Sequence, residues 1–466
     1  MTERQRVEPG LVAVGLALAR WTERWFPDPL VFALLGVLCV FGGGVLTGER
    51  PYVLATQAGK SFWALAPFTL QMVMIIIGGY VVASTPIIRR AIQAIAGIPK
   101  TPRGAIAMVA FFSTTSALLS WGLSLVFSGL LVRELARRVK GFDYCAAGAA
   151  GYLGLSIFAA MGLSSSAALL MATRTAIPAS IYKISGVIPL RQTLFLWQSL
   201  AIIAVVMTIS VSVAWLTAPS AANARTAEDL GVDLSAANAD LDARTKPGEW
   251  LEYSPILTVL VAAILCVYLV DLFRNAPQGA LAALDLNTYN MIFITLGLLF
   301  QWRPKRFLRA VGECVPATAG VLIQFPIYAM IFGMITGTGL SARIAHVFEA
   351  ISTHNTYPLC VAAYSATLGI FIPSAGSKWI VEAPYVMQAA ITNRVHLGWV
   401  VQIYNAAESL PNLINPFWML PLLGILKIRA RNIVSYAMLQ LSVQAPVVFF
   451  LCWFFSRHIE FVPPIK

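Results

Sequence analysis

Hydrophobic and polar positions follow each other along this chain in long blocks. Apolar runs that approach or exceed the roughly 20 residues a helix needs to cross a bilayer occur at 29–47, 63–88, 143–173, 192–217, 253–271, 286–302, 314–336, 398–426 and 433–456. Two further runs, 104–132 and 357–393, are interrupted by polar residues and predict pairs of short helical arms. The pattern predicts an all-α integral membrane protein with about nine spanning helices.

Basic residues indicate how these helices are oriented. They cluster in short loops, at 89–103, 133–140, 303–309 and 427–431, and cytoplasmic loops carry an excess of Lys and Arg. With these loops and the N-terminus in the cytoplasm, 104–132 must be a re-entrant hairpin from the inside and 357–393 one from the outside. The order of elements in 29–217 then recurs in 286–466 with opposite orientation. Inverted repeats with broken helices are typical of secondary transporters.

Two segments lie outside these repeats. Residues 1–28 are expected to be a cytoplasmic N-terminus with an interfacial helix, because one apolar stripe has helical spacing: Leu11, Val14, Leu18, Trp21 and Trp25. The same region also resembles a signal peptide, since arginines precede a short apolar run. Residues 218–285 are expected to hold an acidic cytoplasmic loop with one surface helix, followed by the linking span 253–271.

The composition agrees with a membrane protein and argues against several other functions. The chain is 58% hydrophobic and 12% charged, against about 25% charged residues in soluble domains. The net charge of +12 comes from short loops, so it indicates topology and no nucleic-acid binding. Cysteines and histidines are scattered, which predicts no metal site and no cofactor. The motifs GxSxG and HExxH are absent from the sequence, and we do not expect an enzyme.

Three ionisable residues fall inside apolar sequence. Lys378 and Glu382 are four residues apart, and Glu408 lies in the next run. A charge at bilayer depth costs about 2.5–3.5 kcal/mol on insertion scales, so such residues usually serve function. We expect Glu382 and Glu408 to carry a coupling ion or proton. Alternatively, Lys378 snorkels to the interface or pairs with Glu382, and Glu408 is only bonded to backbone.

Polar residues interrupt both hairpins and both long spans at matching places. A broken helix leaves free N–H groups that attract an anion, typically a carboxylate. Serines in membrane helices also satisfy backbone or ease packing, which is the alternative for each position. The predicted substrate-binding residues are Ser120, Trp121, Gly122, Ser164, Ser165, Ser374, Gly376, Ser377, Lys378, Trp379, Asn412 and Asn415.

Five motifs, in the expected order, resemble the short-chain fatty acid transporter family. Its members are permeases associated with the use of acetoacetate and butyrate. The motifs are WFPDPLVFALL at 25–35, SWGLSLVFSGLLVRELARRV at 120–139, TAGVLIQFPIYAMI at 318–331, IPSAGSKWIVEAPYV at 372–386 and NPFWMLPLLGI from Asn415. The resemblance implies a secondary active transporter of small monocarboxylates in the cytoplasmic (inner) membrane, coupled to H⁺ or Na⁺. Kinship with the ion transporter superfamily implies two opposed hairpins, an elevator motion and a homodimer.

The chain departs from that family pattern at three positions. Ser120 stands where the family has asparagine, Lys378 where it has histidine, and Glu382 where it has glutamine. These changes add a charge pair beside the expected substrate site. A carrier or exporter of another small organic anion or of an amino acid therefore stays open as the alternative.

Overall fold

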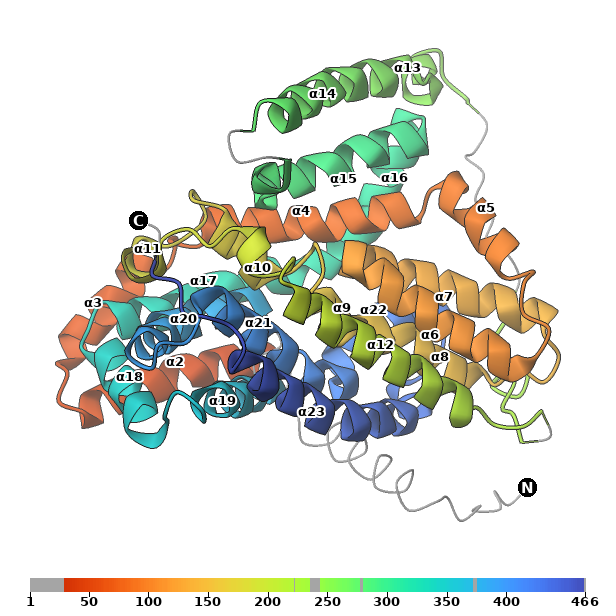
Figure 1. The fold of residues 1–466 in the computed structure, drawn as a ribbon. Coiled ribbons are helices and arrows are strands. Elements are labelled where there is room, and N and C mark those ends of the chain that lie inside the picture. The colour runs from red at the N-terminus through yellow and green to blue at the C-terminus, as the bar shows by residue number, and fades with distance from the viewer. Residues whose placement is uncertain (1–28, 222, 235–243, 277–279, 372–374, 465–466) are drawn as a thin grey trace.

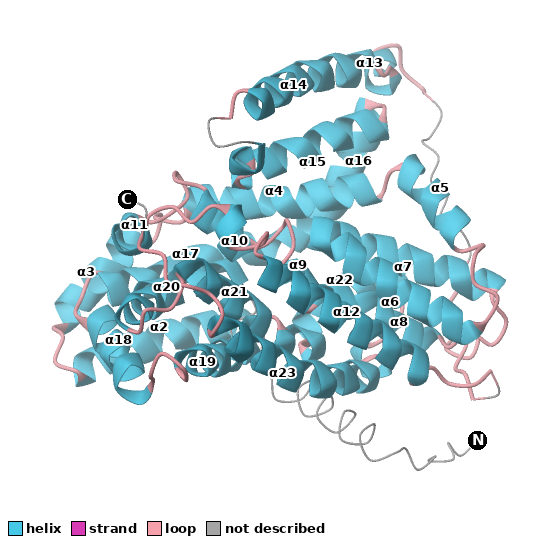
Figure 2. Ribbon diagram, in the orientation of Figure 1, coloured by secondary structure: helices cyan, strands magenta, loops and turns pink. Residues whose placement is uncertain are grey.

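The computed structural model describes residues 29–221, 223–234, 244–276, 280–371 and 375–464. Within these ranges every regular element is a helix (Figure 2). Five of the described helices are long and apolar enough to cross a membrane, namely α4 (Ala66–Ala83), α12 (Trp197–Leu216), α14 (Ile256–Arg274), α17 (Ala319–Thr336) and α23 (Val434–Ser456). Each coincides with a predicted span, although α14 continues three residues beyond the predicted 253–271, so the all-helical membrane class is confirmed. The expected interfacial helix of residues 1–28 lies outside the described residues.

The first half of the chain contains the predicted interruptions. After α2 (Pro29–Leu46), α3 (Pro51–Ser61), α4 and α5 (Pro86–Ile95), the chain forms α6 (Pro102–Leu119) and α7 (Trp121–Arg138), which pack on each other. Only the extended Ser120 separates them. The run 143–173 is broken into α8 (Tyr144–Tyr152), η1 (Leu153–Leu155), α9 (Ile157–Ala160) and α10 (Ser166–Ala172). The helices α11 (Ala179–Ser185), η2 (Leu190–Gln192) and α12 complete this half.

The second half also contains whole and broken helices. Its elements are α13 (Glu249–Tyr253), α14, η3 (Ala280–Ala283), α15 (Leu286–Gln301), α16 (Pro304–Cys314), η4 (Val315–Thr318), α17, α18 (Leu340–Ile351), α19 (Tyr357–Phe371), α20 (Ala375–Thr392), α21 (Leu397–Glu408), η5 (Leu410–Ile414), α22 (Pro416–Leu426), η6 (Ala430–Asn432) and α23. Pro411 and Pro416 stand where α21 gives way to η5 and α22. Proline lacks an N–H donor and disfavours helix in the residue before it.

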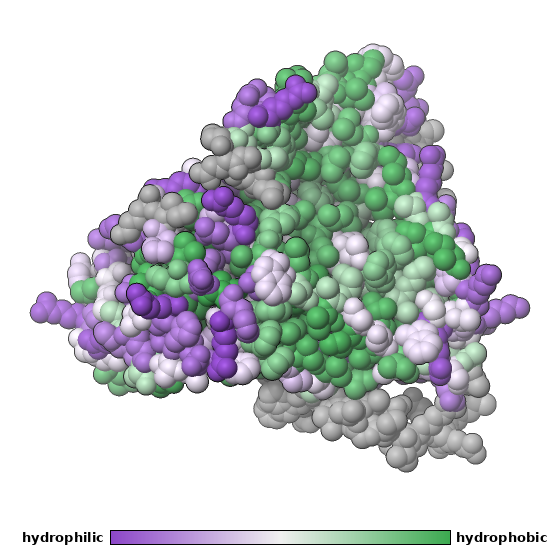
Figure 3. Space-filling view, viewed as in Figure 1, coloured by the Kyte–Doolittle hydropathy of each residue, from purple (hydrophilic) through white to green (hydrophobic). Residues whose placement is uncertain are grey.

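Helices of the two halves pack against one another (Figure 1). α4 packs against both α7 and α15, and α17 packs against α2, α3 and α20. α14 lies at one edge, where it packs mainly on α15, and only 11% of its apolar window is buried. Its exposed side chains include Leu260, Ile264 and Val267. Hydrophobic residues cover the middle of the visible face in Figure 3, with hydrophilic residues gathered at its margins, as expected of a surface that faces lipid.

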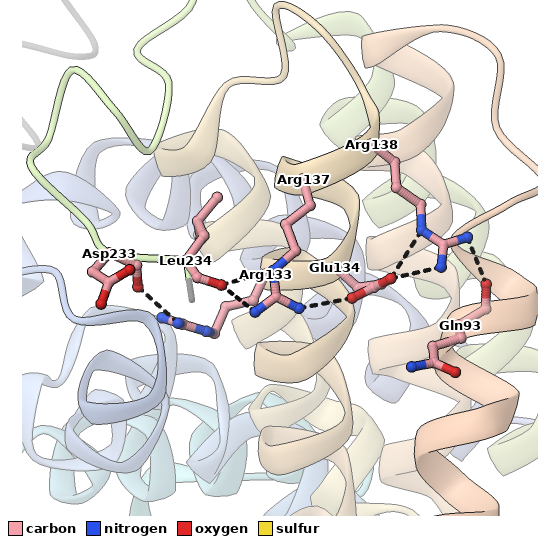
Figure 4. Close-up of polar contacts among 7 residues, drawn as sticks. All are labelled: Gln93, Arg133, Glu134, Arg137, Arg138, Asp233 and Leu234. Carbon is pink, nitrogen blue, oxygen red and sulfur yellow. Dashed lines mark hydrogen bonds and ion pairs between the residues drawn. The ribbon is translucent and has the colours of Figure 1, made fainter. Parts of the chain in front are cut away.

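The polar segment after α12 is held by the C-terminal end of α7 (Figure 4). The Arg133 guanidinium donates to the Asp233 carbonyl at 2.8 Å, and the Arg137 Nε donates to the Leu234 carbonyl at 2.7 Å. Glu134 pairs with Arg137 and with Arg138, whose Nη1 also donates to the Gln93 carbonyl of α5. Cations at a helix C-terminus complement its dipole. This arginine cluster therefore stabilises the C-terminal end of α7. It also holds the segment after α12 and helix α5 against that end.

Candidate functional site

The broken helices of the two halves meet in the interior of the protein. Tyr152 of α8 donates its hydroxyl to the Asn412 carbonyl of η5 at 2.6 Å, and the Asn412 side-chain amide donates to the Leu155 carbonyl at 3.4 Å. At the start of α20, a Cβ on Gly376 would lie 3.2 Å from the Ser166 side chain of α10. Segments at the predicted interruptions of the two halves thus lie side by side.

A buried ion pair occupies this site. Lys378 Nζ lies 2.8 Å from Glu408 Oε2, and the two side chains are 0% and 3% exposed. Lys378 therefore does not reach the surface, and its hydrogen-bonded partner is Glu408 of α21 rather than Glu382. Helix α19 passes so closely that a Cβ on Gly369 would lie 3.1 Å from Lys378 Nζ. Each of these two buried charges stabilises the other, because a lone buried charge is strongly unfavourable.

A second carboxylate accompanies the pair. Glu382 is fully buried one helical turn beyond Lys378, and its Oε2 accepts a hydrogen bond from Ser365 Oγ of α19 at 2.7 Å. The other oxygens, Glu382 Oε1 and Glu408 Oε1, have no hydrogen-bond partner within the part of the chain that the structure describes. Buried polar atoms are usually paired. The site therefore offers two free acceptors next to a single ammonium group.

Aromatic side chains close one flank of the site. The rings of Trp379 and Tyr404 lie 4.7 Å apart, and Lys378 Nζ lies 5.7 Å from the Tyr404 ring centre. The Tyr404 hydroxyl donates to the Ala375 carbonyl at 2.5 Å, which holds α21 against the first turn of α20. Lys378 is thus placed between a carboxylate and an aromatic face, both of which favour a cation.

The first hairpin uses its serines differently. Ser120 Oγ accepts from the Leu123 N–H at 3.4 Å and so caps α7, while Ser165 Oγ caps α10 by accepting from the Ala168 N–H at 3.3 Å. Ser164 Oγ accepts from the Trp121 N–H at 3.1 Å, which ties the first break to the hairpin. These hydroxyls satisfy the N–H groups that helix starts leave free. In this structure they act on the backbone.

Of the predicted residues, the structure therefore gathers two sets. Lys378, Glu382, Glu408, Ser377 and Trp379 share the buried interior of the second half, and Ser120, Trp121, Gly122, Ser164 and Ser165 surround the first hairpin turn. Gly376 and Asn412 link the halves, and Asn415 ends η5. Ser374 lies outside the described residues. No group of His, Cys, Asp or Glu able to hold a metal ion occurs among the residues covered.

Sequence reasoning missed Tyr289, Tyr404 and Ser365. Tyr289 of α15 is 4% exposed, and its hydroxyl donates to the Leu119 carbonyl at 2.9 Å, at the turn between α6 and α7. Polar residues adjoin each of these positions in the sequence, but nothing local shows which other helix their hydroxyls contact. Only the tertiary arrangement brings their hydroxyls to the breaks.

Buried opposite charges where broken helices meet, inside an all-helical membrane protein, define a solute transporter rather than an enzyme. Comparison with known proteins agrees. A family model described as "Short chain fatty acid transporter" matches residues 11–455. The chain belongs to the short-chain fatty acid transporter family.

Similar proteins support this assignment. An Escherichia coli (strain K12) protein is 32% identical over 422 residues, which cover 90% of this chain and 94% of that protein. A Haemophilus influenzae (strain Rd) protein is 29% identical over 450 residues, covering 93% and 97% of the two chains. Both are named "Putative short-chain fatty acid transporter". The Alcanivorax borkumensis YdaH transporter has the same fold, with a TM-score of 0.60 at 15% identity over 92% of this chain and 98% of that one.

Proposed function

We propose that this protein is a secondary active carrier that moves a short-chain fatty acid or a similar small monocarboxylate together with H⁺ or Na⁺. The observation that carries the proposal is the buried Lys378–Glu408 pair with Glu382 beside it. An ammonium group in the first turn of a helix suits a carboxylate, and free carboxylate oxygens suit a cation. A site with both is what a symporter of an anion and a cation needs.

In this proposal Lys378 and Ser377 bind the substrate carboxylate, and Trp379 contacts the acyl chain. Glu382 and Glu408 take the coupling cation, because each has one oxygen with no partner among the described residues. The first half contributes the opposite wall through Ser120, Trp121, Gly122, Ser164 and Ser165. The half-buried Trp121 packs edge-on against Trp418, with 5.8 Å between the ring centroids. An acyl chain would therefore contact an aromatic surface there.

The proposed architecture is the one expected from the sequence. It has nine spans and two re-entrant hairpins, 104–132 and 357–393, within inverted repeats 29–217 and 286–466. The carrier lies in the inner membrane with its N-terminus in the cytoplasm, works by an elevator motion and forms a homodimer. The family assignment, the five long apolar helices and the paired breaks support this arrangement.

Uptake of labelled acetoacetate and butyrate into proteoliposomes tests the proposal. A pH gradient and a sodium gradient are applied separately, with the exposed-site variant Lys60→Met as a control for loss of a lysine. Uptake driven by one gradient, abolished by Lys378→Met and kept by Lys60→Met, supports the proposal and names the cation. Absence of uptake under both gradients contradicts it for these substrates.

A second candidate, a carrier or exporter of another small organic anion or an amino acid, is favoured by one observation. The unpartnered oxygens of Glu382 and Glu408 can accept hydrogen bonds from a hydroxyl or amino group that a simple fatty acid lacks. A screen of hydroxy-, keto- and amino-acids in the same vesicles tests it. Uptake of such a compound in place of butyrate would establish this alternative.

A further inference from the structure

Each charge of the buried pair lies at a helix end whose dipole disfavours it. Lys378 lies in the first turn of α20, and Glu408 is the last residue of α21. A helix carries partial positive charge at its N-terminus and partial negative charge at its C-terminus. An anion would therefore suit the position of Lys378, and a cation that of Glu408, better than the charges now there. What holds the two side chains in place is their mutual contact of 2.8 Å.

We propose that this ion pair substitutes for both ligands in the empty carrier. On loading, the substrate carboxylate displaces Glu408 from Lys378, and the coupling cation takes the place of the lysine ammonium at Glu408. The inference rests on the proposed monocarboxylate symport. It adds that the same two residues pair with each other in the empty site, so that the empty carrier can reorient without leaving either of these two charges unpaired.

The charges balance in both states. The empty site contains one ammonium and the Glu408 carboxylate, paired with each other. The loaded site contains the ammonium with the substrate carboxylate, and Glu408 with one cation. The remaining titratable groups that face the pair are Glu382 of α20, bonded to Ser365 of α19, and Tyr404 of α21. The coupling cation compensates the charge of the substrate carboxylate, so the proposed stoichiometry is one cation per monocarboxylate and transport is electroneutral.

The space around the pair favours exchange of partners over simultaneous binding. Gly369 of α19 leaves no room beside Lys378, since even a Cβ there would lie 3.1 Å from Nζ and 2.6 Å from the Glu408 carbonyl. Trp379 and Tyr404 close the other side. A carboxylate can therefore reach Lys378 only by taking the position that the Glu408 side chain now occupies. Binding of substrate and release of Glu408 are one event.

The test compares exchange with net uptake in proteoliposomes. Exchange uses substrate and cation at equal concentration on both sides, and needs only the loaded carrier to reorient. Net uptake also needs the empty carrier to return. In Glu408→Gln, exchange should fall far less than net uptake does. Net uptake should fall on the order of a hundredfold and lose its dependence on the cation gradient, because Lys378 is left unpaired in the empty state.

Matched variants make the outcome decisive. Glu252→Gln removes an exposed carboxylate that pairs with Lys305 and should leave both modes unchanged. Glu408→Asp keeps the charge and should retain gradient-driven uptake. Wild-type uptake should not respond to a valinomycin-imposed potassium potential.

Three results overturn the inference: uptake by Glu408→Gln that still follows the cation gradient, equal losses of exchange and net uptake in a folded Glu408→Gln, or wild-type uptake driven by the potential. If Glu408→Gln does not fold, the Asp variant and the potential measurement decide. Failure of the wild type to transport any monocarboxylate is a different result, because it rejects the proposed function itself.

Discussion

Replacing Lys378 by methionine leaves the Glu408 carboxylate buried without its partner. At 2.8 Å the two charges attract each other by about 6 kcal/mol at an effective dielectric constant of about 20, and desolvation offsets part of this. Breaking a buried pair by removing one partner typically costs about 3–5 kcal/mol. We expect Lys378→Met and Glu408→Gln each to lower the free energy of unfolding by that amount.

The double variant Lys378→Met/Glu408→Gln should regain most of the loss, because no unpaired charge remains. Replacing a buried pair by neutral residues of similar volume is often neutral or stabilising. The double-mutant cycle therefore gives a coupling energy of about 3 kcal/mol or more, against about 0.5 kcal/mol for independent sites. The free energies are measured by SDS titration in mixed micelles, with intrinsic tryptophan fluorescence as the probe.

The exposed pair Lys305–Glu252 is the matched control. Its N–O distance is also 2.8 Å, but its side chains are 40% and 48% exposed. Pairs in contact with water contribute little because solvent screens them, so this cycle should show no coupling beyond experimental error. Additive effects of Lys378→Met and Glu408→Gln would refute the reasoning, since they would mean that the two charges do not meet in the stable state.

Two further predictions concern the packing around the site. Tyr289→Phe removes the donor to the partly buried Leu119 carbonyl and should cost about 0.5–1.5 kcal/mol of unfolding free energy, the usual net contribution of one hydrogen bond. Tyr268→Phe on the exposed face of α14 should change nothing in the same titration. Gly369→Ala places a Cβ 2.6 Å from the Glu408 carbonyl, and overpacking of this kind typically costs about 1–3 kcal/mol. Gly312→Ala, which meets nothing within 4 Å, should be neutral or stabilising by up to about 1 kcal/mol.

The positions where helices break could be predicted from the sequence because their cause is local. Ser120 and Ser165 start a helix through their own side chains, by capping it. The apolar runs were also predictable from the sequence, since four of the five long helices lie inside predicted spans and α14 extends only three residues beyond its span. Local chemistry therefore sufficed for the elements and for the outline of the site.

The partner of Lys378 could not be predicted, because its cause is not local. Sequence spacing favours Glu382, four residues away on the same helix face, yet the ammonium group bonds to Glu408, thirty residues on. A side chain in the first turn of α20 meets the C-terminal end of α21 because Tyr404 binds the Ala375 carbonyl and brings the two helices together. Tyr289 and Ser365 escaped notice for the same reason, since their importance lies in contacts between helices.

The helix interruptions of the two halves differ in the polar groups that they contain. Around the first hairpin, Ser120 and Ser164 accept from backbone N–H groups, so these two hydroxyl oxygens are neutral and already hydrogen-bonded. Around the second, Lys378, Glu382 and Glu408 bring charge into the interior and leave carboxylate oxygens without a partner among the described residues. A satisfied hydroxyl gains little from a ligand, whereas an unpartnered buried oxygen gains much. Ligand binding should therefore be driven by the second half, with the first half shaping the wall that the acyl chain meets.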